Sequence, residues 1–245
     1  MVYGIISDIH GNLEALQKVI SFLKGKIDKL IVIGDVVGYG PNPNECLELL
    51  YNENPEFTLG NHEEGILKGD LSNFSEDARI SLEWTISNLS PENFEKIKRW
   101  PEKIEKGDIL FLHASPSNPT KGYILSQSQA KRAFQALEKR LCFNGHTHFP
   151  ICFRKKQKEE KVEVIPCDFS GSLKVKIEEN YIYMINVGSV GQPRDGFPFA
   201  CAGIYDDEKK IFELFRIEYP VEITKEKILE KGLPSSLAGR LLRGL

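Results

Sequence analysis

Residues 2–11 read VYGIISDIHG, an apolar run that ends directly before an aspartate and a histidine. The run from residue 2 to residue 6 has the length and composition of a short buried strand. Apolar residues then recur at helical spacing over residues 13–23, and a second apolar run follows at residues 30–33. This strand, helix, strand order predicts a βαβ unit with two parallel strands.

The alternation continues through the first 150 residues. Proline and glycine punctuate the segments, so their limits can be placed. We expect helices near residues 45–51, 75–87, 91–98 and 126–137, and strands near residues 57–59, 109–113 and 141–144. An α/β fold is therefore predicted for this part of the chain.

After residue 149 the pattern changes to short β-rich segments separated by charged or glycine turns. Six strands are expected, near residues 151–153, 162–165, 173–177, 181–186, 200–205 and 211–217. They predict a second, more antiparallel sheet packed on the first, with the lysine-rich run 155–161 as a solvated hairpin tip. We expect one domain over residues 1–245, in which motif-bearing residues 1–150 and β-rich residues 151–220 precede a helical tail, 221–245.

Composition limits the kinds of protein this can be. The chain has 245 residues, 41% hydrophobic and 27% charged, which is typical of a globular protein. It has no signal peptide pattern and no apolar stretch near the roughly 18 residues of a membrane span. Its five cysteines are scattered without C-x-x-C spacing, so we expect a reducing, cytoplasmic setting. A net charge of −3 and no basic, aromatic-interleaved stripe argue against long nucleic acid as a partner.

All five histidines lie in short polar segments just after predicted strands. Carboxyl ends of parallel strands share one edge of a sheet, so these segments should converge there. A lone histidine beside a strand is usually a hydrogen-bonded core residue, and Asn61 alone could be a turn residue in left-handed conformation. The ordered set instead favours metal ligands. The segments are Asp8-x-His10, Gly34-Asp35, Gly60-Asn61-His62-Glu63, His113 and Gly145-His146-x-His148.

Local spacing supports the metal interpretation. Asp8 and His10 are two residues apart, so on extended backbone both side chains would project to the same side and could meet one cation. Gly145 to His148 repeats that arrangement, and Gly34 would permit the tight turn that exposes Asp35.

These motifs, in this order, resemble those of the calcineurin-like metallophosphoesterase superfamily over about residues 4–148. A weaker likeness continues in residues 186–194, NVGSVGQPR, which resemble a segment of the small bacterial phosphodiesterase branch. The resemblance implies a four-layer α/β/β/α sandwich of two mixed sheets with a dinuclear metal site. By this resemblance Asp35 bridges two cations, one also bound by Asp8, His10 and His148 and the other by Asn61, His113 and His146.

The implied site has a definite charge and metal preference. Two divalent cations against Asp8 and Asp35 leave an excess of about +2, which suits a phosphate group. Imidazole, carboxylate and amide ligands favour Mn, Fe, Co, Ni or Zn over Mg or Ca, and we expect Mn. A water between the two metals would then become a hydroxide nucleophile near neutral pH.

Three further positions have expected roles. By resemblance, His62 would protonate the departing oxygen or stabilise its charge, and Glu63 would orient His62. Arg194 would either reach a substrate phosphate or form an ion pair with Asp195. Many superfamily members carry aspartate at the position of Gly38 and at that of Glu63. Residues 38–41 are therefore either a rim of the substrate site or only a turn.

The predicted activity is hydrolysis of a small phosphate ester, with nucleotides among the candidate substrates. A diester is preferred because of the resemblance and because the motif loops lack clustered arginines, which would favour a monoester dianion. A phosphomonoesterase or protein phosphatase, a dinucleoside polyphosphate hydrolase and a non-catalytic binding scaffold of the same fold remain alternatives. The scaffold is disfavoured because such proteins usually lack one or more of these histidines.

Overall fold

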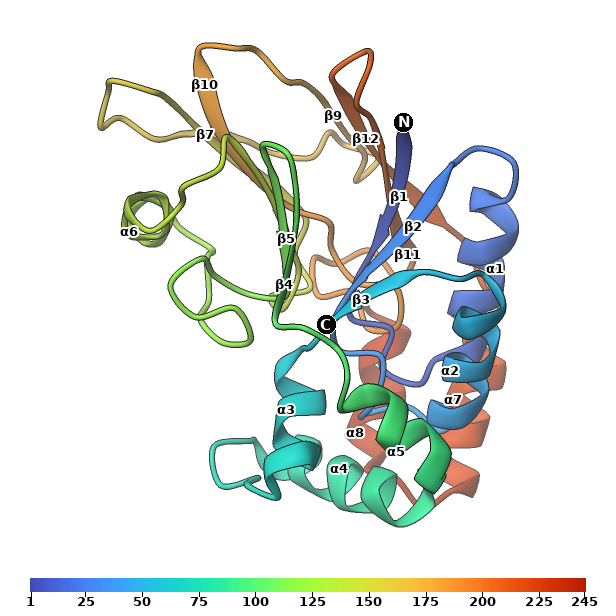
Figure 1. The fold of residues 1–245 in the computed structure, drawn as a ribbon. Coiled ribbons are helices and arrows are strands. Elements are labelled where there is room, and N and C mark those ends of the chain that lie inside the picture. Colours follow the sequence, from blue (N-terminus) through green and yellow to red (C-terminus); the bar gives the residue numbers. More distant parts are fainter.

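The computed structural model describes residues 1–245 and contains two six-stranded sheets that face each other (Figure 1). The first sheet has the order β3-β2-β1-β11-β12-β9 and the second the order β4-β5-β6-β10-β7-β8. The strands are β1 (Val2–Ile6), β2 (Lys29–Ile33), β3 (Glu56–Thr58), β4 (Lys103–Lys106), β5 (Ile109–Leu112), β6 (Leu141–Asn144), β7 (Ile151–Lys156), β8 (Glu163–Ile165), β9 (Leu173–Lys176), β10 (Tyr181–Asn186), β11 (Ala200–Asp206) and β12 (Ile211–Ile217).

Both sheets are mixed. Strands β1, β2 and β3 are parallel, whereas β11, β12 and β9 join them by antiparallel pairing. In the second sheet β5, β6 and β10 are parallel, and β4, β7 and β8 pair antiparallel at the two sides. The prediction that the late strands form a sheet of their own was wrong, because they divide between the two sheets. Apolar periodicity identifies a strand but does not identify its neighbours.

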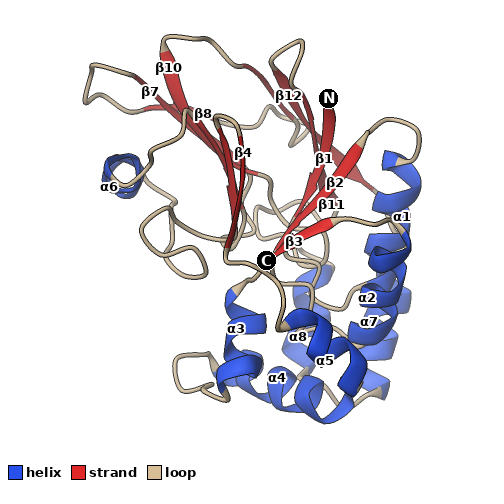
Figure 2. Cartoon of the chain, in the orientation of Figure 1, coloured by secondary structure: helices blue, strands red, loops and turns tan.

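Helices cover the outer faces of both sheets (Figure 2). Helices α1, α2 and α7 pack outside the first sheet, and α6 alone covers the second. The result is the predicted four-layer α/β/β/α sandwich. The helices are α1 (Leu13–Leu23), α2 (Pro43–Asn52), α3 (Asn61–Lys68), α4 (Glu76–Asn88), α5 (Pro91–Ile97), α6 (Gln127–Gln135), α7 (Val221–Glu230) and α8 (Ser235–Leu241). None of them combines the length and apolar composition needed to cross a bilayer.

The central strands are apolar on both faces because each sheet is covered on both sides. Ile5 and Ile31 face the second sheet, where they join a cluster that includes Phe111. Ile6 and Val32 point the opposite way into the cluster beneath the helices. This packing gives β1 and β2 a fixed register, so the loops that follow them have fixed positions.

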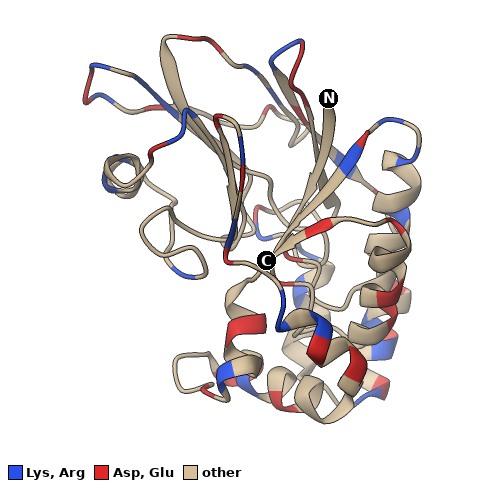
Figure 3. Cartoon of the chain, viewed as in Figure 1, with Lys and Arg blue, Asp and Glu red and all other residues tan.

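Charged residues gather on helix surfaces and hairpin tips rather than between the sheets (Figure 3). The predicted lysine-rich tip is one of these, because β7 and β8 pair antiparallel and residues 156–161 are exposed. Two elements were not predicted: helix α3, which begins at Asn61, and strand β4, which pairs with β5. The charged sequence of β4 has no clear apolar alternation, since this edge strand is only partly buried.

Candidate metal centre

The histidine-bearing segments converge at the carboxyl ends of the strands, as predicted. They follow β1, β2 and β3 in the first sheet and β5 and β6 in the second. The two sheets therefore contribute to one site from facing edges. Asn61 is the first residue of α3 and has ordinary helical backbone, so the alternative of an isolated left-handed turn does not apply to it.

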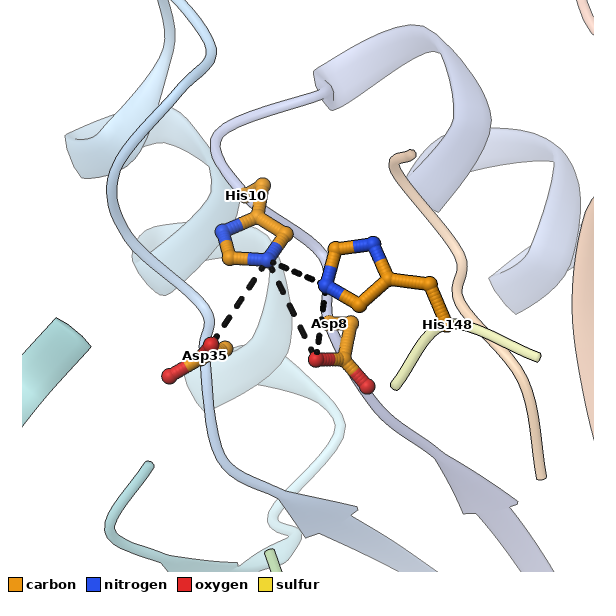
Figure 4. Close-up of side chains that lie close together, drawn as sticks. All are labelled: Asp8, His10, Asp35 and His148. Carbon is orange, nitrogen blue, oxygen red and sulfur yellow. Dashed lines mark hydrogen bonds and ion pairs between the residues drawn. The ribbon is translucent and has the colours of Figure 1, made fainter. Parts of the chain in front are cut away.

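We call Asp8, His10, Asp35 and His148 the inner group; their ligand atoms lie within 4.8 Å of one another (Figure 4). Nε2 of His10 is 3.1 Å from Nε2 of His148 and 3.6 Å from Oδ2 of Asp35. Nε2 of His148 is 3.2 Å from Oδ1 of Asp8. Figure 4 shows the four side chains pointing toward one another: Asp8 and His10 come from the loop after β1, Asp35 from the loop after β2 and His148 from the loop after β6. The arrangement has the donor number and spacing of a site for one cation.

A second set, which we call the cavity group, shares Asp35 with the inner group and adds Asn61, His113 and His146. Nε2 of His113 is 3.3 Å from Oδ2 of Asp35, 3.1 Å from Oδ1 of Asn61 and 3.1 Å from Nδ1 of His146. The carboxylate and two imidazoles meet the same 4.8 Å limit. The structure thus brings together all seven predicted ligands as two groups with Asp35 in common.

The backbone at these residues differs from the extended geometry that the spacing suggested. Asp8, His10 and Asp35 have φ of 54°, 49° and 52°, and His146 and His148 have φ of 66° and 59°. Left-handed backbone is uncommon for residues other than glycine and is concentrated at functional sites. The side chains converge because each loop turns sharply after its strand, and not because neighbours alternate along a strand.

Backbone carbonyls fix three of the imidazole rings. Nδ1 of His10 donates to the carbonyl of Val37 at 3.1 Å, and Nδ1 of His148 donates to that of Gln192 at 2.6 Å. Nδ1 of His113 likewise lies 2.9 Å from a carbonyl oxygen. A carbonyl can only accept, so each neutral ring turns an unprotonated Nε2 toward the site. Such contacts are the usual way in which proteins orient metal-binding histidines.

The side chains of the inner group direct free lone pairs toward one another, as ligands of a cation do. Nε2 of His10 and Nε2 of His148 face each other at 3.1 Å without a proton of their own to share. Oδ1 of Asp8 is buried and accepts no hydrogen bond. A buried carboxylate oxygen without a partner is costly unless a positive charge lies beside it. The donors are nitrogen and oxygen, as in sites for first-row transition metals.

The pKa values reflect burial and neighbouring charge. Burial lowers the pKa of His10 and of His148, and it lowers that of His146 to about 3. Burial would also lower the pKa of His113, but the negative charge of Asp35 raises it to about 10. A metal ion must displace any proton from its ligands, so cation binding at His113 competes with this protonation.

The carboxylates of Asp8 and Asp35 are both held in the ionised form. Burial raises the pKa of Asp8, but its contact with His148 outweighs burial and holds that pKa well below its usual range. Asp35 is held low in the same way by His113. Ionised carboxylates are the form that binds metal.

Glu63 supports the site but does not orient His62, which corrects that expectation. Its carboxylate accepts hydrogen bonds from the backbone N–H groups of Asp35, Val36, Val37 and Gly60, at 2.8 to 3.1 Å. Burial and the nearby Asp35 charge raise the pKa of Glu63 to about 7, while the four donors favour its ionised form. Glu63 therefore fixes the loop that carries Asp35.

His62 lies beside Asp35 with its Nε2 3.9 Å from Oδ2, and its own backbone N–H donates to Oδ1 of Asp35 at 2.9 Å. Its Nδ1 is buried without a hydrogen-bond partner. Burial lowers the pKa of His62 to about 4. Gly38 packs against this ring, and a Cβ at Gly38 would lie 2.1 Å from Nδ1. The glycine that departs from the superfamily pattern thus leaves room for His62.

A cavity of about 390 Å³ opens beside the cavity group, and Asn61, His62 and His146 line its inner end. Tyr39 also lines it, so the loop at residues 38–41 forms a wall of the cavity and is more than a turn. Arg194 lines it as well. Its guanidinium donates to Oε1 of Gln192 at 2.7 Å.

The expected alternative for Arg194, an ion pair with Asp195, is absent because Asp195 pairs with the buried Arg216. The lining residues that were not predicted as site residues include Lys121, Tyr123 and Arg240. They belong to no motif and come from a loop after β5 and from the tail helix α8. No periodicity or spacing in the sequence indicates that these segments approach the site.

Known proteins resemble this chain along its whole length. The family model for calcineurin-like phosphoesterases matches residues 1–150. The uncharacterized protein MJ0912 of Methanocaldococcus jannaschii is 36% identical over 98% of this chain and 97% of its own. A metallophosphoesterase from Sphaerobacter thermophilus has a solved structure with a TM-score of 0.87 and 35% identity, covering 100% of both chains.

A hypothetical protein from Pyrococcus horikoshii, PH1004, shares the fold with a TM-score of 0.80 at 20% identity, over 100% of this chain and 98% of its own. The family match, the whole-length relatives and the two ligand groups agree with one another. The chain belongs to the calcineurin-like phosphoesterase family.

Proposed function

We propose that this protein hydrolyses a small phosphate ester with two divalent cations as cofactors, Mn being the expected metal. The observation that carries the proposal is the pair of ligand groups that share Asp35. Two bound cations would lower the pKa of a coordinated water toward neutrality and offset the charge of the phosphoryl group. Asp8, His10 and His148 would hold one of them, and Asn61, His113 and His146 the other.

His62 would act on the departing oxygen. Its ring lies between the shared carboxylate and the cavity, with Nδ1 free of protein partners. A proton or hydrogen bond from this ring would stabilise the negative charge that develops as the ester bond breaks. The rings of Tyr39 and Phe74, with centroids 4.7 and 5.3 Å from that of His62, would keep it in place.

The cavity lining bears on the substrate preference. The sequence favours a diester partly because the motif loops lack clustered arginines. Arg194 and Arg240 nevertheless both line the cavity. This observation favours a second candidate, a substrate whose phosphoryl group carries two negative charges or that has several phosphoryl groups. A non-catalytic scaffold is disfavoured because the chain has all seven candidate ligand residues and His62.

The decisive experiment replaces His62 by Asn in metal-reconstituted protein and follows paired chromogenic mono- and diesters. Turnover should fall by about a hundred-fold or more, as expected when a proton donor is lost, while metal content stays normal. Asn88→Ala, at the exposed end of α4, is the control and should match the unchanged protein. Undiminished turnover by the His62→Asn protein would remove this residue from the reaction.

The same assays rank the metals and esters. Metal-stripped protein should be inactive and should regain most activity with Mn when Mn, Fe, Co, Ni and Zn are compared. Faster cleavage of the monoester would replace the diester preference.

The five free cysteines fit the reducing cytoplasm, which is the location we propose.

A further inference from the structure

Two arginines in the cavity lack the partners that arginines usually have. Neither Arg194 nor Arg240 forms an ion pair with any carboxylate, whereas Lys121, which also lines the cavity, is paired with Glu64 at 3.2 Å. Nε of Arg194 is buried without a hydrogen-bond partner. Partly buried guanidinium groups left in this way are suited to an anionic ligand.

The two arginines occupy different positions relative to the metal ligands. The backbone N–H of Arg194 donates to the carbonyl of His148 at 3.2 Å, so this residue is tied directly to the inner group. Its guanidinium lies 5.7 Å from the centroid of the Tyr39 ring. That ring packs edge-on against His10, with centroids 4.6 Å apart. Arg194 is thus placed for a phosphoryl group at the metals.

Arg240 reaches the cavity from the tail helix α8. Apolar residues of α7, α8 and the turn between them form a cluster against which Tyr39 packs, so Tyr39 separates the tail from the inner group. The tail is held in place, because the backbone N–H of Gly196 donates to the carbonyl of Gly244 at 2.9 Å. Arg240 therefore belongs to a fixed part of the cavity wall.

The charge of the cavity favours more than one anionic group. Three basic residues line it, against one carboxylate, the exposed Asp70, whose Oδ1 accepts hydrogen bonds from Ser72. A single phosphoryl group at the metals would be contacted by Arg194 and would leave Arg240 without a partner. The volume of about 390 Å³ is large enough for a small organic ligand.

We propose that Arg240 binds a second phosphoryl group of the substrate, so that the preferred substrates are phosphate esters with two separate phosphoryl groups. The inference rests on the proposed function for the group that is cleaved. It assigns the helical tail, which lies outside the residues that define the family, a part in substrate selection.

Calorimetric titration of Mn-loaded His62→Asn protein tests this without turnover. The probes are propyl phosphate and the bisphosphates of ethane-, propane- and butanediol, whose spacers sample different separations. At least one bisphosphate should bind about ten-fold tighter than propyl phosphate, as expected for an added charge-assisted contact. Adding Arg240→Gln should remove most of this preference, and Arg240→Lys should restore part of it.

Arg243→Gln is the matched control, because Arg243 lies in the turn just after the same helix, is exposed and does not line the cavity. It should keep the full preference. Equal binding of all four probes, or a preference that survives Arg240→Gln, overturns the inference. Absence of turnover in the unchanged protein would instead count against the proposed function, while the binding preference would still test Arg240.

Discussion

The inner group and the cavity group share Asp35 but differ in how they are enclosed. Every side chain of the inner group is almost completely buried. In the cavity group His146 is 8% exposed, and its ring lies 4.6 Å from that of Tyr123, which is 56% exposed. The inner group would therefore enclose a cation completely, whereas the cavity group also faces the cavity.

The rings of the two groups are also held differently. His10 and His148 each donate through Nδ1 to a backbone carbonyl, which fixes both rings of the inner group. His146 turns Nδ1 toward His113 instead, and only its backbone N–H is held, by Oδ2 of Asp8 at 3.0 Å. Fewer constraints on a ligand allow easier metal exchange. We expect the cavity group to exchange its cation faster.

The largest effect should follow from changing the residue that both groups share. Asp35→Asn keeps an oxygen that can accept from the backbone of His62 but removes the negative charge between the two cations. Metal content should fall at both positions and turnover by about a thousand-fold or more, since the activation of water is lost with the metals. Elemental analysis and a phosphate-release assay would measure both. Asp108→Asn, at an exposed ion pair with Arg140, is the control. Two bound metals in the Asp35→Asn protein would show that the groups are independent.

A paired substitution tests the difference between the groups directly. His146→Ala should weaken one metal equivalent by about 10- to 100-fold and leave the other bound, because His146 contributes only to the cavity group. His10→Ala should weaken the other metal equivalent, because His10 contributes only to the inner group. Competition with a chelator, followed by metal analysis of each protein, separates the two. Identical release curves for both variants would contradict the distinction.

The smallest effect is expected from a change that leaves every ligand in place. Gly38→Ala puts a Cβ 2.1 Å from Nδ1 of His62, so the ring must shift from its position. Turnover should drop by about ten-fold with normal metal content, because a small misplacement of a reacting group slows catalysis. Gly69→Ala is the control: Gly69 has a similar positive φ, 67° against 83°, but open space around it. Equal losses in both variants would indicate backbone strain and not displacement of His62.

Much of the site could be predicted because its signals are local. Each ligand follows an apolar strand, and the parallel order of β1, β2 and β3 fixes which edge the loops share. The role of Glu63 could not be predicted in this way. It bonds to backbone groups 26 to 28 residues earlier in the chain, in a loop whose left-handed turn has no sequence signal other than Gly34.

By itself, the sequence determined most of the strands and helices, though not α3 or β4, and which side chains are candidates for the metals, because apolar periodicity and residue type act over a few neighbouring positions. Only the tertiary structure decided how the late strands divide between two sheets and that Arg240 lines the same cavity as His62. Those features depend on contacts between residues far apart in the chain. Such contacts are set by the packing of whole layers, which no short stretch of sequence specifies.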